Sequence, residues 1–360
     1  ALDIDGNAVL GSSSSTNDTI TGLASLDVTG TTVIETATLT STGTQRFRGN
    51  VTLGTATTLT TTDSAITFDA ALASDVGETN DLTIAAGSGA VTFTGAVGAV
   101  DRLGAVNVGS SGITLFGSSA RAISLTTNVG GTTKLTGDVD TTDHQLFNDV
   151  VVLLGNVSLS GRDITLNMTT DSDAAQTARA LTVSGSGTTT FGGTVGAAAI
   201  LSSLTVNGGG KTALNGASIK TAGAQTYDDI LVLGHDIVLT GTDITLNGRV
   251  DSAAASTPRA LTVTGTGAKT FNAALGSSVV LGALTVNGGG TTVLHGGVIN
   301  TDGAQTFTDA ATLSADTLLT SLGGNISFAS TLGSDTTPRS LEITAGAGDV
   351  TFTGAVGTQS

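Results

Sequence analysis

The chain has 360 residues, of which 51 are glycine, 2 are proline and none is cysteine, and its formal net charge at pH 7 is −16. With 29 acidic against 13 basic residues, it lacks the Lys/Arg stripes that nucleic acids require, and binding to an anionic membrane is disfavoured for the same reason. Disulfide stapling is excluded, and no apolar run is long enough to insert into a membrane as a helix.

The sequence is an array of one long repeat. Residues 1–22 are predicted to be the end of a preceding copy, followed by full copies at 23–102, 103–200, 201–280 and 281–360. Each full copy contains a glutamine with an aromatic residue two places later: Gln45 and Phe47, Gln145 and Phe147, Gln225 and Tyr227, and Gln305 and Phe307. We therefore expect one continuous repeat protein rather than a set of unlike domains.

The second copy is 98 residues long, 18 more than its 80-residue neighbours, and the excess falls before Gln145, around ITLFGSSARAISLTTNVGG. An insertion that keeps both flanks in register should equal one structural unit. This length predicts one extra coil in the second copy, a coil of about 18–20 residues, and about four coils per repeat.

Short runs such as LTV, ITL and VTF alternate apolar residues with Thr or Ser, and they end at Gly, Asn or Asp. This period of two is typical of strands, the glycines suit tight corners, and the scarcity of proline leaves backbone N–H groups free for ladders. The prediction is an all-β parallel β-solenoid without helices, with about 18 coils of about 20 residues and a length of about 85 Å.

Aromatic residues fall in repeated positions, which indicates a stacked core rather than a ligand platform. Phe68 and Phe328 close apolar strands, and Phe116 lies outside the pattern, in the inserted coil. The predicted core ladder consists of Phe47, Phe147, Tyr227, Phe307, Phe93, Phe191, Phe271 and Phe352.

Residues suited to catalysis do not form a pattern. His144, His235 and His295 occupy unmatched positions, and Asp163 and Asp243 recur in DITLN, where turn capping is the simpler role. No local carboxylate pair interrupts the repeat, so we expect no catalytic residue and no enzyme. Ice binding would need threonine pairs at one register in every coil, whereas the threonine-rich string at 57–62 has no counterpart in other copies.

The acidic composition raises the question of calcium. The glycine runs at 207–210 and 287–290 lack the following aspartate of calcium-binding nonapeptides. No metal or cofactor is therefore expected, although a looser calcium site remains an alternative near four aspartates: Asp171, Asp173, Asp251 and Asp335.

Three arginines end a variable segment of the repeat: Arg179, Arg259 and Arg339. One interpretation is a solvated loop with a surface Asp–Arg pair worth under about 1 kcal/mol. The other is a lateral contact, because four-coil repeats would place these arginines along one edge of the solenoid at intervals of about 19 Å.

The repeats ALTVTGTGAKTFNAALG, LGALTVNGGGTTVLHGG and GAQTFTDAATL resemble the strand-repeat regions of giant bacterial surface proteins, similar to filamentous-haemagglutinin and autotransporter adhesins. The resemblance covers residues 23–360 and consists of a similar general pattern of residues and a similar periodicity, without a diagnostic signature. It implies a right-handed parallel β-helix outside the cell, in a stalk, filament or adhesin, and it transfers no functional residue.

We therefore expect an extracellular or cell-surface structural protein. Neither end of the sequence looks like a natural terminus, so either the chain is an excerpt of a longer one or its ends meet other copies. Self-association end to end or side by side is expected. The alternatives are an adhesin that binds glycans or a host-surface receptor, a polysaccharide-degrading β-helix enzyme, and an ice-binding protein.

Overall fold

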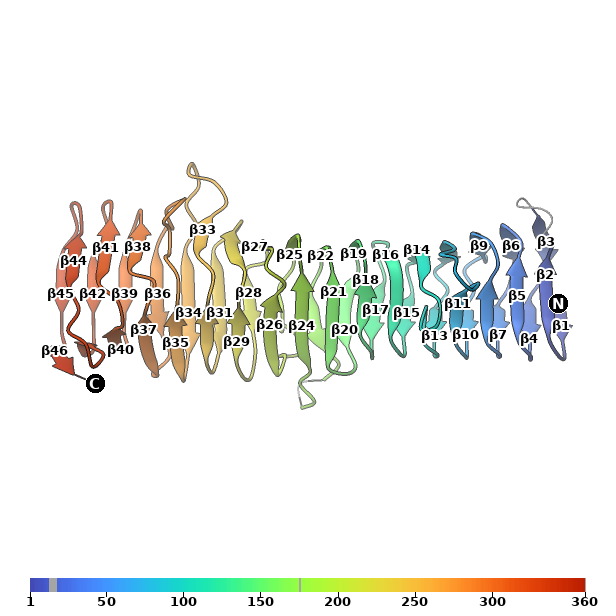
Figure 1. Cartoon of the computed structure of the whole chain (residues 1–360), viewed down its shortest axis with the longest axis horizontal. Helices are drawn as coiled ribbons and strands as arrows, with labels where there is room; N and C mark the ends of the chain where they lie inside the picture. The colour runs from blue at the N-terminus through green and yellow to red at the C-terminus, as the bar shows by residue number, and fades with distance from the viewer. Residues whose placement is uncertain (13–17, 175, 360) are drawn as a thin grey trace. The chain divides into compact units, whose positions relative to one another are not determined.

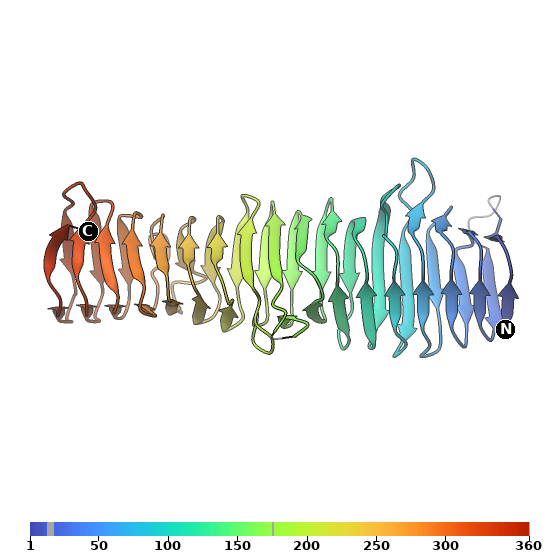
Figure 2. The same ribbon diagram turned by 90° about the horizontal axis from the view of Figure 1, so that it is seen from below.

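The computed structural model describes residues 1–12, 18–174 and 176–359. Every paired strand in this part of the chain is parallel to its neighbours, no helix is present there, and the fold is a parallel β-solenoid of about 17 turns with about 21 residues per turn. The predicted fold class is confirmed. The chain divides into two compact units, residues 1–173 and 174–360, and within each unit the strands of successive turns lie side by side (Figures 1 and 2).

Unit 1 has three strand ladders. Ladder A contains β1 (Leu2–Ile4), β4 (Leu26–Val28), β7 (Gln45–Phe47), β10 (Ile66–Phe68), β13 (Val91–Phe93), β15 (Ile113–Phe116), β17 (Thr132–Leu135), β20 (Val150–Leu153) and β23 (Thr170–Ser172). Ladder B contains β2 (Ala8–Gly11), β5 (Thr32–Glu35), β8 (Val51–Leu53), β11 (Leu72–Ser74), a single bridge at Val97, the start of β16 (Ala120–Thr127), β18 (Val139–Thr141) and β21 (Val157–Gly161). Ladder C contains β3 (Thr19–Leu23), β6 (Thr38–Ser41), β9 (Thr57–Thr60), β12 (Leu82–Gly87), β14 (Leu103–Ser110), the end of β16, β19 (His144–Phe147) and β22 (Asp163–Leu166).

Unit 2 also has three ladders. Ladder D contains β24 (Ala180–Gly185), β26 (Ser203–Asn207), β29 (Gln225–Tyr227), β32 (Ile244–Leu246), β35 (Ala268–Phe271), β37 (Thr291–Leu294), β40 (Ala310–Leu313), β43 (Leu332–Ser334) and β46 (Val356–Gln359). Ladder E contains β28 (Ser218–Lys220), β31 (Ile237–Gly241), β34 (Leu261–Gly265), β36 (Leu284–Asn287), β39 (Gln305–Phe307), β42 (Ile326–Phe328) and β45 (Val350–Phe352). Ladder F contains β25 (Thr188–Phe191), β27 (Lys211–Leu214), β30 (Ile230–Leu233), β33 (Val250–Ser252), a single bridge at Leu275, β38 (Val298–Thr301), β41 (Thr317–Ser321) and β44 (Leu341–Thr344).

The length of a turn varies with its corner loops. In ladder A, Thr133 pairs with Val151, whereas Ile66 pairs with Val91 across a longer stretch of chain. Strand pairing fixes the register of the strands but leaves the loops free to lengthen. The mean turn is for this reason slightly longer, and the number of turns slightly smaller, than the sequence predicts.

The sequence repeat and the turn are out of phase. Gln225 lies in β29 of ladder D, but Gln305, one repeat later, lies in β39 of ladder E. From β29 to β39 the chain passes eleven strand positions, counting the bridge at Leu275 as one. Three positions make one turn, so one repeat occupies three and two-thirds turns rather than the expected four.

Unit 1 shows the same offset with one additional turn. Gln45 lies in ladder A and Gln145 in ladder C, fourteen strand positions later. The three extra positions are β15 and the two halves of β16, and Ile113 at the start of this turn pairs with Thr132 at the start of the next. The inserted residues therefore form one full turn.

The aromatic side chains fill the interior in short stacks. Phe47, Phe68, Phe93 and Phe116 stack in unit 1 with ring centroids 5.0–5.2 Å apart, and Phe307, Phe328 and Phe352 stack in unit 2 at 4.7 and 5.5 Å. Phe116, expected outside the pattern, completes a stack because β15 pairs in register with β13.

The other aromatic residues of the predicted ladder are buried without a ring partner in these stacks: Phe147, Phe191, Tyr227 and Phe271. They face aliphatic or threonine side chains in neighbouring strands, because successive repeats place the same aromatic in different ladders. Phe352 is 40% exposed, and its strand β45 is the last of ladder E among the described residues.

Candidate functional site

The repeated glutamine is an internal connector between turns. The Nε2 group of Gln305 donates to Ile299 O at 3.2 Å and to Thr320 O at 2.9 Å, six residues before and fifteen residues after it. Gln45, Gln145 and Gln225 make the corresponding pair of bonds, and all four side chains are buried. The glutamine thus satisfies two backbone carbonyl groups inside the solenoid, where water cannot do so.

A buried aspartate follows this glutamine by four residues in three of the four repeats. Asp149 Oδ1 accepts from Gly131 N at 2.9 Å, and Asp229 Oδ1 accepts from Gly209 N at 3.0 Å. Burial raises the pKa of both carboxyl groups, and the hydrogen bonds from the glycine N–H lower it in part. These carboxylates hold glycine corners through hydrogen bonds from the glycine N–H groups.

The third aspartate of this set forms a buried ion pair. Asp309 Oδ1 accepts from Gly289 N at 2.9 Å, and Asp309 Oδ2 lies 2.9 Å from Lys269 Nζ. Lys269 is fully buried and also donates to Gly265 O at 2.7 Å and Gly267 O at 3.2 Å. This pair was not predicted from the sequence, although one signal was present: Lys269 stands in AKTF at the position that Thr189 occupies in TTTF one repeat earlier.

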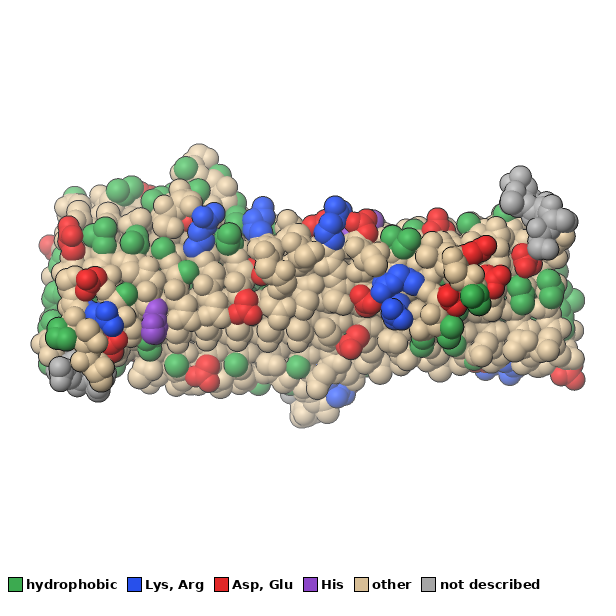
Figure 3. Space-filling model, in the orientation of Figure 1, with side chains coloured by type: hydrophobic (Ala, Val, Ile, Leu, Met, Phe, Trp, Pro, Cys, Tyr) green, Lys and Arg blue, Asp and Glu red, His purple; other side chains and the backbone are tan. Residues whose placement is uncertain are grey.

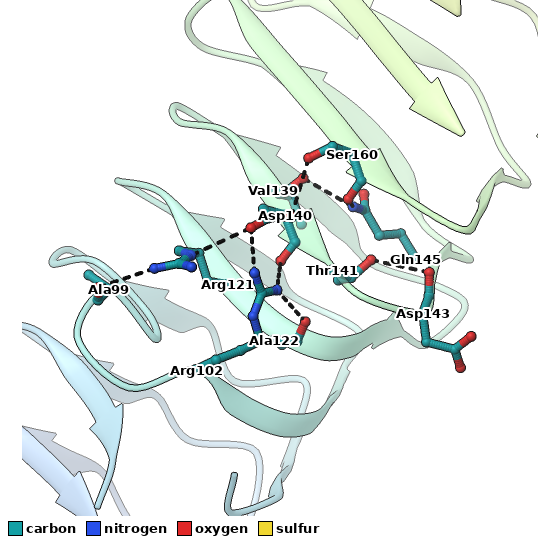
Figure 4. Close-up of polar contacts among 10 residues, drawn as sticks. All are labelled: Ala99, Arg102, Arg121, Ala122, Val139, Asp140, Thr141, Asp143, Gln145 and Ser160. Atoms are coloured by element: carbon teal, nitrogen blue, oxygen red, sulfur yellow. Dashed lines mark hydrogen bonds and ion pairs between the residues drawn. The ribbon is translucent and has the colours of Figure 1, made fainter. Parts of the chain in front are cut away.

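The inserted turn carries a polar cluster on unit 1. Arg102 lies before β14, and its guanidinium donates to Ala122 O at 2.8 Å and Asp140 O at 2.7 Å and pairs with the Asp140 carboxylate at 2.5 Å (Figure 4). Arg121 approaches the same carboxylate at 3.5 Å. Arg102 thereby reaches across the inserted strand β16 to β18 and ties three successive turns together.

The three arginine loops lie on different sides of unit 2. Arg179 precedes β24 of ladder D, Arg259 precedes β34 of ladder E, and Arg339 precedes β44 of ladder F. In Figure 1 the loop between β33 and β34 rises on the upper side, whereas the chain leading into β24 runs on the lower side. Each repeat is rotated by a third of a revolution relative to the one before, so the three arginines do not share one edge, and a lateral contact through them remains a prediction.

Local partners occupy the side chains considered for calcium and catalysis. Asp251 accepts from Ser278 N and Val279 N and pairs with Arg249, and Asp335 pairs with Arg339 at 3.0 Å. Asp163 pairs with Arg162, and Asp243 accepts from Ala268 N at 2.7 Å as a turn cap. Within the described ranges, no group of three His, Cys, Asp or Glu side chains could hold a metal ion.

His144 lies in unit 1, and His235 and His295 lie in unit 2. His144 contacts its neighbour Asp143 at 3.0 Å, and this hydrogen bond lowers the pKa of Asp143. His235 contacts Asp236 O at 3.1 Å, and His295 follows β37. None of these contacts joins a histidine to a nucleophile.

The hollows of unit 1 are shallow. One of about 250 Å³ is lined by Asn107, Thr126, Asn128 and Asn148 together with the apolar residues Ile84 and Val108. In Figure 3, charged side chains are scattered over the visible face of each unit, among backbone and uncharged side chains. Among the residues that the structure describes, no helix has the length and apolarity to span a membrane.

These ladders define a parallel β-solenoid repeat protein. No family model, no curated protein and no solved structure matches the chain.

Proposed function

We propose that the chain is an extracellular structural protein, a β-solenoid that serves as a spacer in a cell-surface stalk, filament or sheath. The main support for this proposal is that the repeated polar side chains point into the interior of the solenoid. The glutamine that recurs in every full copy is buried and hydrogen-bonds to the backbone of adjacent turns. The repeated residue therefore stabilises the stacking of turns and does not form a surface site.

The phase offset supports the same proposal. A repeated binding face needs equivalent residues on one side, whereas equivalent residues of successive repeats lie in different ladders in each unit. The outward positions of ladder A are also mixed, and from β4 to β17 they are Asp27, Arg46, Thr67, Thr92, Leu115 and Lys134. Such a surface disfavours a flat threonine rank of the kind that ice binding requires.

Electron microscopy of the purified chain tests the proposal. A spacer gives elongated particles, and a filament component gives particles that join end to end or side by side into fibres. Immunogold labelling of the source cells, with protease treatment of intact cells, should locate the protein at the surface. Compact particles, or labelling confined to the cell interior, would contradict the proposal.

A glycan-binding adhesin is the second candidate. The threonine- and asparagine-lined hollow of unit 1 presents hydroxyl and amide groups, which are the groups that hydrogen-bond sugars. A glycan array with the wild-type chain and with Asn107→Ala distinguishes the two functions. Binding that the substitution abolishes favours the adhesin, and an array without signal favours the spacer.

A further inference from the structure

Lys269 and Asp309 bring an amine and a carboxyl group together inside unit 2. They lie in different repeats of the sequence, and the distance between Lys269 Nζ and Asp309 Oδ2 is 2.9 Å. Lys269 is fully buried and Asp309 is 7% exposed. Ordinary surface ion pairs have neither this burial nor this fixed geometry, since solvent screens and reorients them.

Three further contacts hold the two groups in place. Gly265 O and Gly267 O accept from Lys269 Nζ and orient it. Gly289 N donates to Asp309 Oδ1 at 2.9 Å, and Oδ2, which lies 2.9 Å from the amine, accepts no hydrogen bond in the described part of the chain. A backbone N–H in this position stabilises negative charge that develops on a carbonyl oxygen during attack at its carbon.

The preceding repeat supplies a comparison within the same unit. Thr189 occupies the strand position that Lys269 occupies one repeat later, and Asp229 Oδ2 there accepts from Thr212 Oγ1 at 3.4 Å. At Asp309, in the fourth repeat, Lys269 of the third repeat takes the place of this hydroxyl partner. Thr292, paired in register with Lys269, is left with a buried Oγ1 that lacks a hydrogen-bond partner in the described part of the chain.

We propose that Lys269 and Asp309 form an intramolecular isopeptide bond, a covalent link between turns of unit 2. For this bond to form, a proton must pass from Lys269 Nζ to Asp309 Oδ2, and these two atoms lie 2.9 Å apart. The amine then attacks Asp309 Cγ, while Gly289 N–H stabilises the charge that develops on Oδ1.

The reaction balances with water as its one by-product. The Nζ–Cγ bond forms and the Cγ–Oδ2 bond breaks, and Oδ2 leaves as water with its own proton and one proton from Nζ. No group is oxidised or reduced. The remaining N–H of the new amide keeps a donor for Gly265 O, so the product satisfies the same buried acceptor. The covalent link would resist mechanical force applied along the chain. The proposal of this bond does not depend on the spacer function.

The intact mass of the purified full chain is the test. An isopeptide bond lowers the mass by one water molecule relative to the sequence. Digestion after Phe and Leu should then release a branched peptide that joins the segment containing Lys269 to the segment containing Asp309. A chain with the full sequence mass, or a water loss without that branched peptide, overturns the proposal.

Matched variants locate the bond. Lys269→Thr copies the residue of the preceding repeat, and Lys269→Arg keeps the charge without an amine that can acylate. Both should show the full sequence mass, as should Asp309→Ala. A variant that still lacks one water contradicts the assignment. Because the wild-type mass is decisive by itself, the test does not depend on how well the variants fold.

Discussion

The hydroxyl of Tyr227 donates a hydrogen bond to Gln225 Oε1 at 2.9 Å in the interior of unit 2. Both side chains are fully buried, and burial raises the pKa of the Tyr227 hydroxyl, which stays protonated and able to donate. In the other three repeats a phenylalanine occupies the tyrosine position, and the equivalent glutamine Oε1 has no hydrogen-bond partner in the described part of the chain. The hydroxyl group of Tyr227 thus satisfies the glutamine Oε1 in the third repeat, whereas the equivalent Oε1 atoms of the other repeats lack a donor.

Tyr227→Phe should destabilise unit 2 by about 1–3 kcal/mol, because it leaves the oxygen of Gln225 buried without a donor. Urea unfolding, together with hydrogen exchange of the β29 amides, measures the change. The reverse substitution, Phe147→Tyr, is the matched comparison, since it offers a donor to Gln145 Oε1 in unit 1. An unchanged unfolding midpoint for Tyr227→Phe would show that the hydroxyl contributes nothing.

Gln305→Leu should cost about 2 kcal/mol or more. Leucine fills a similar volume but donates no hydrogen bond, so Ile299 O and Thr320 O lose a partner inside the solenoid. Thr306→Val in the same strand is the control, because Thr306 points outward and should change stability by less than about 0.5 kcal/mol. Equal thermal midpoints for the two variants would refute the role of the glutamine as a connector.

Two adjacent glycines should differ in their tolerance of alanine. A Cβ atom on Gly290 would lie 1.8 Å from Gly267 O, so Gly290→Ala must displace backbone and should cost about 3 kcal/mol. Gly289 has φ of +97° but open space around its Cβ position, so Gly289→Ala should cost about 1–2 kcal/mol. Thermal unfolding of both variants checks the order, and the opposite ranking would contradict the close packing of turns at this corner.

The buried aspartates predict how the stability of the protein should change with pH. Since burial raises the folded-state pKa of Asp229 above 3.8, the folded protein binds this proton more tightly than the unfolded chain. Stability therefore falls as pH rises from 3.8 through the folded pKa. Asp229→Asn should remove this slope, so the free energy of unfolding of the variant relative to wild type should be higher at about pH 7 than at about pH 4.

Asp335 provides a control of opposite sign. Its pKa is lowered by the hydrogen bond from Arg339, so its contribution is present above the unfolded value of 3.8 and is lost as pH falls through the folded pKa. The free energy of unfolding of Asp335→Asn should depend on pH differently from that of the wild type only in that acidic range. Urea midpoints measured across the acid range test both variants, and identical slopes for all three proteins would argue against the buried carboxyl.

Deleting residues 113–131 should preserve the fold of unit 1, because the deleted segment equals one register step, from Ile113 to its partner Thr132. Leu135 would then follow Phe93 in the interior in place of Phe116. Deleting residues 113–122 removes only part of a turn, so it should misalign every later strand of the unit and flip buried side chains outward. Circular dichroism and limited proteolysis should show a folded protein in the first case and loss of folded protein in the second.

The sequence was sufficient to predict the class of fold. Runs such as ITF at 66–68 and VTF at 91–93 pair in register as strands, with alternating side chains directed inward. Alternation is a local property, set by the two-residue period of a strand, and it could therefore be recognised without a structure. The position of the three arginines could not be predicted in the same way. A single arginine edge would require a whole number of turns per repeat, and this number is not a local property of the sequence.

The polar interior was also beyond sequence reasoning. Lys269 and Asp309 belong to different repeats, and only the stacking of β35, β37 and β40 brings their side chains together. Asp149, Asp229 and Asp309 resemble exposed turn residues in the sequence, but glycine corners cover them in the fold.

By itself, the amino-acid sequence determined the strands, the corners between them and the stacking of parallel turns, because these follow from local alternation and from glycine placement. The tertiary structure alone decided which side each repeat faces and which buried charges meet. These features depend on the summed lengths of all intervening corners, and eleven strand segments per repeat divide into three per turn with two left over.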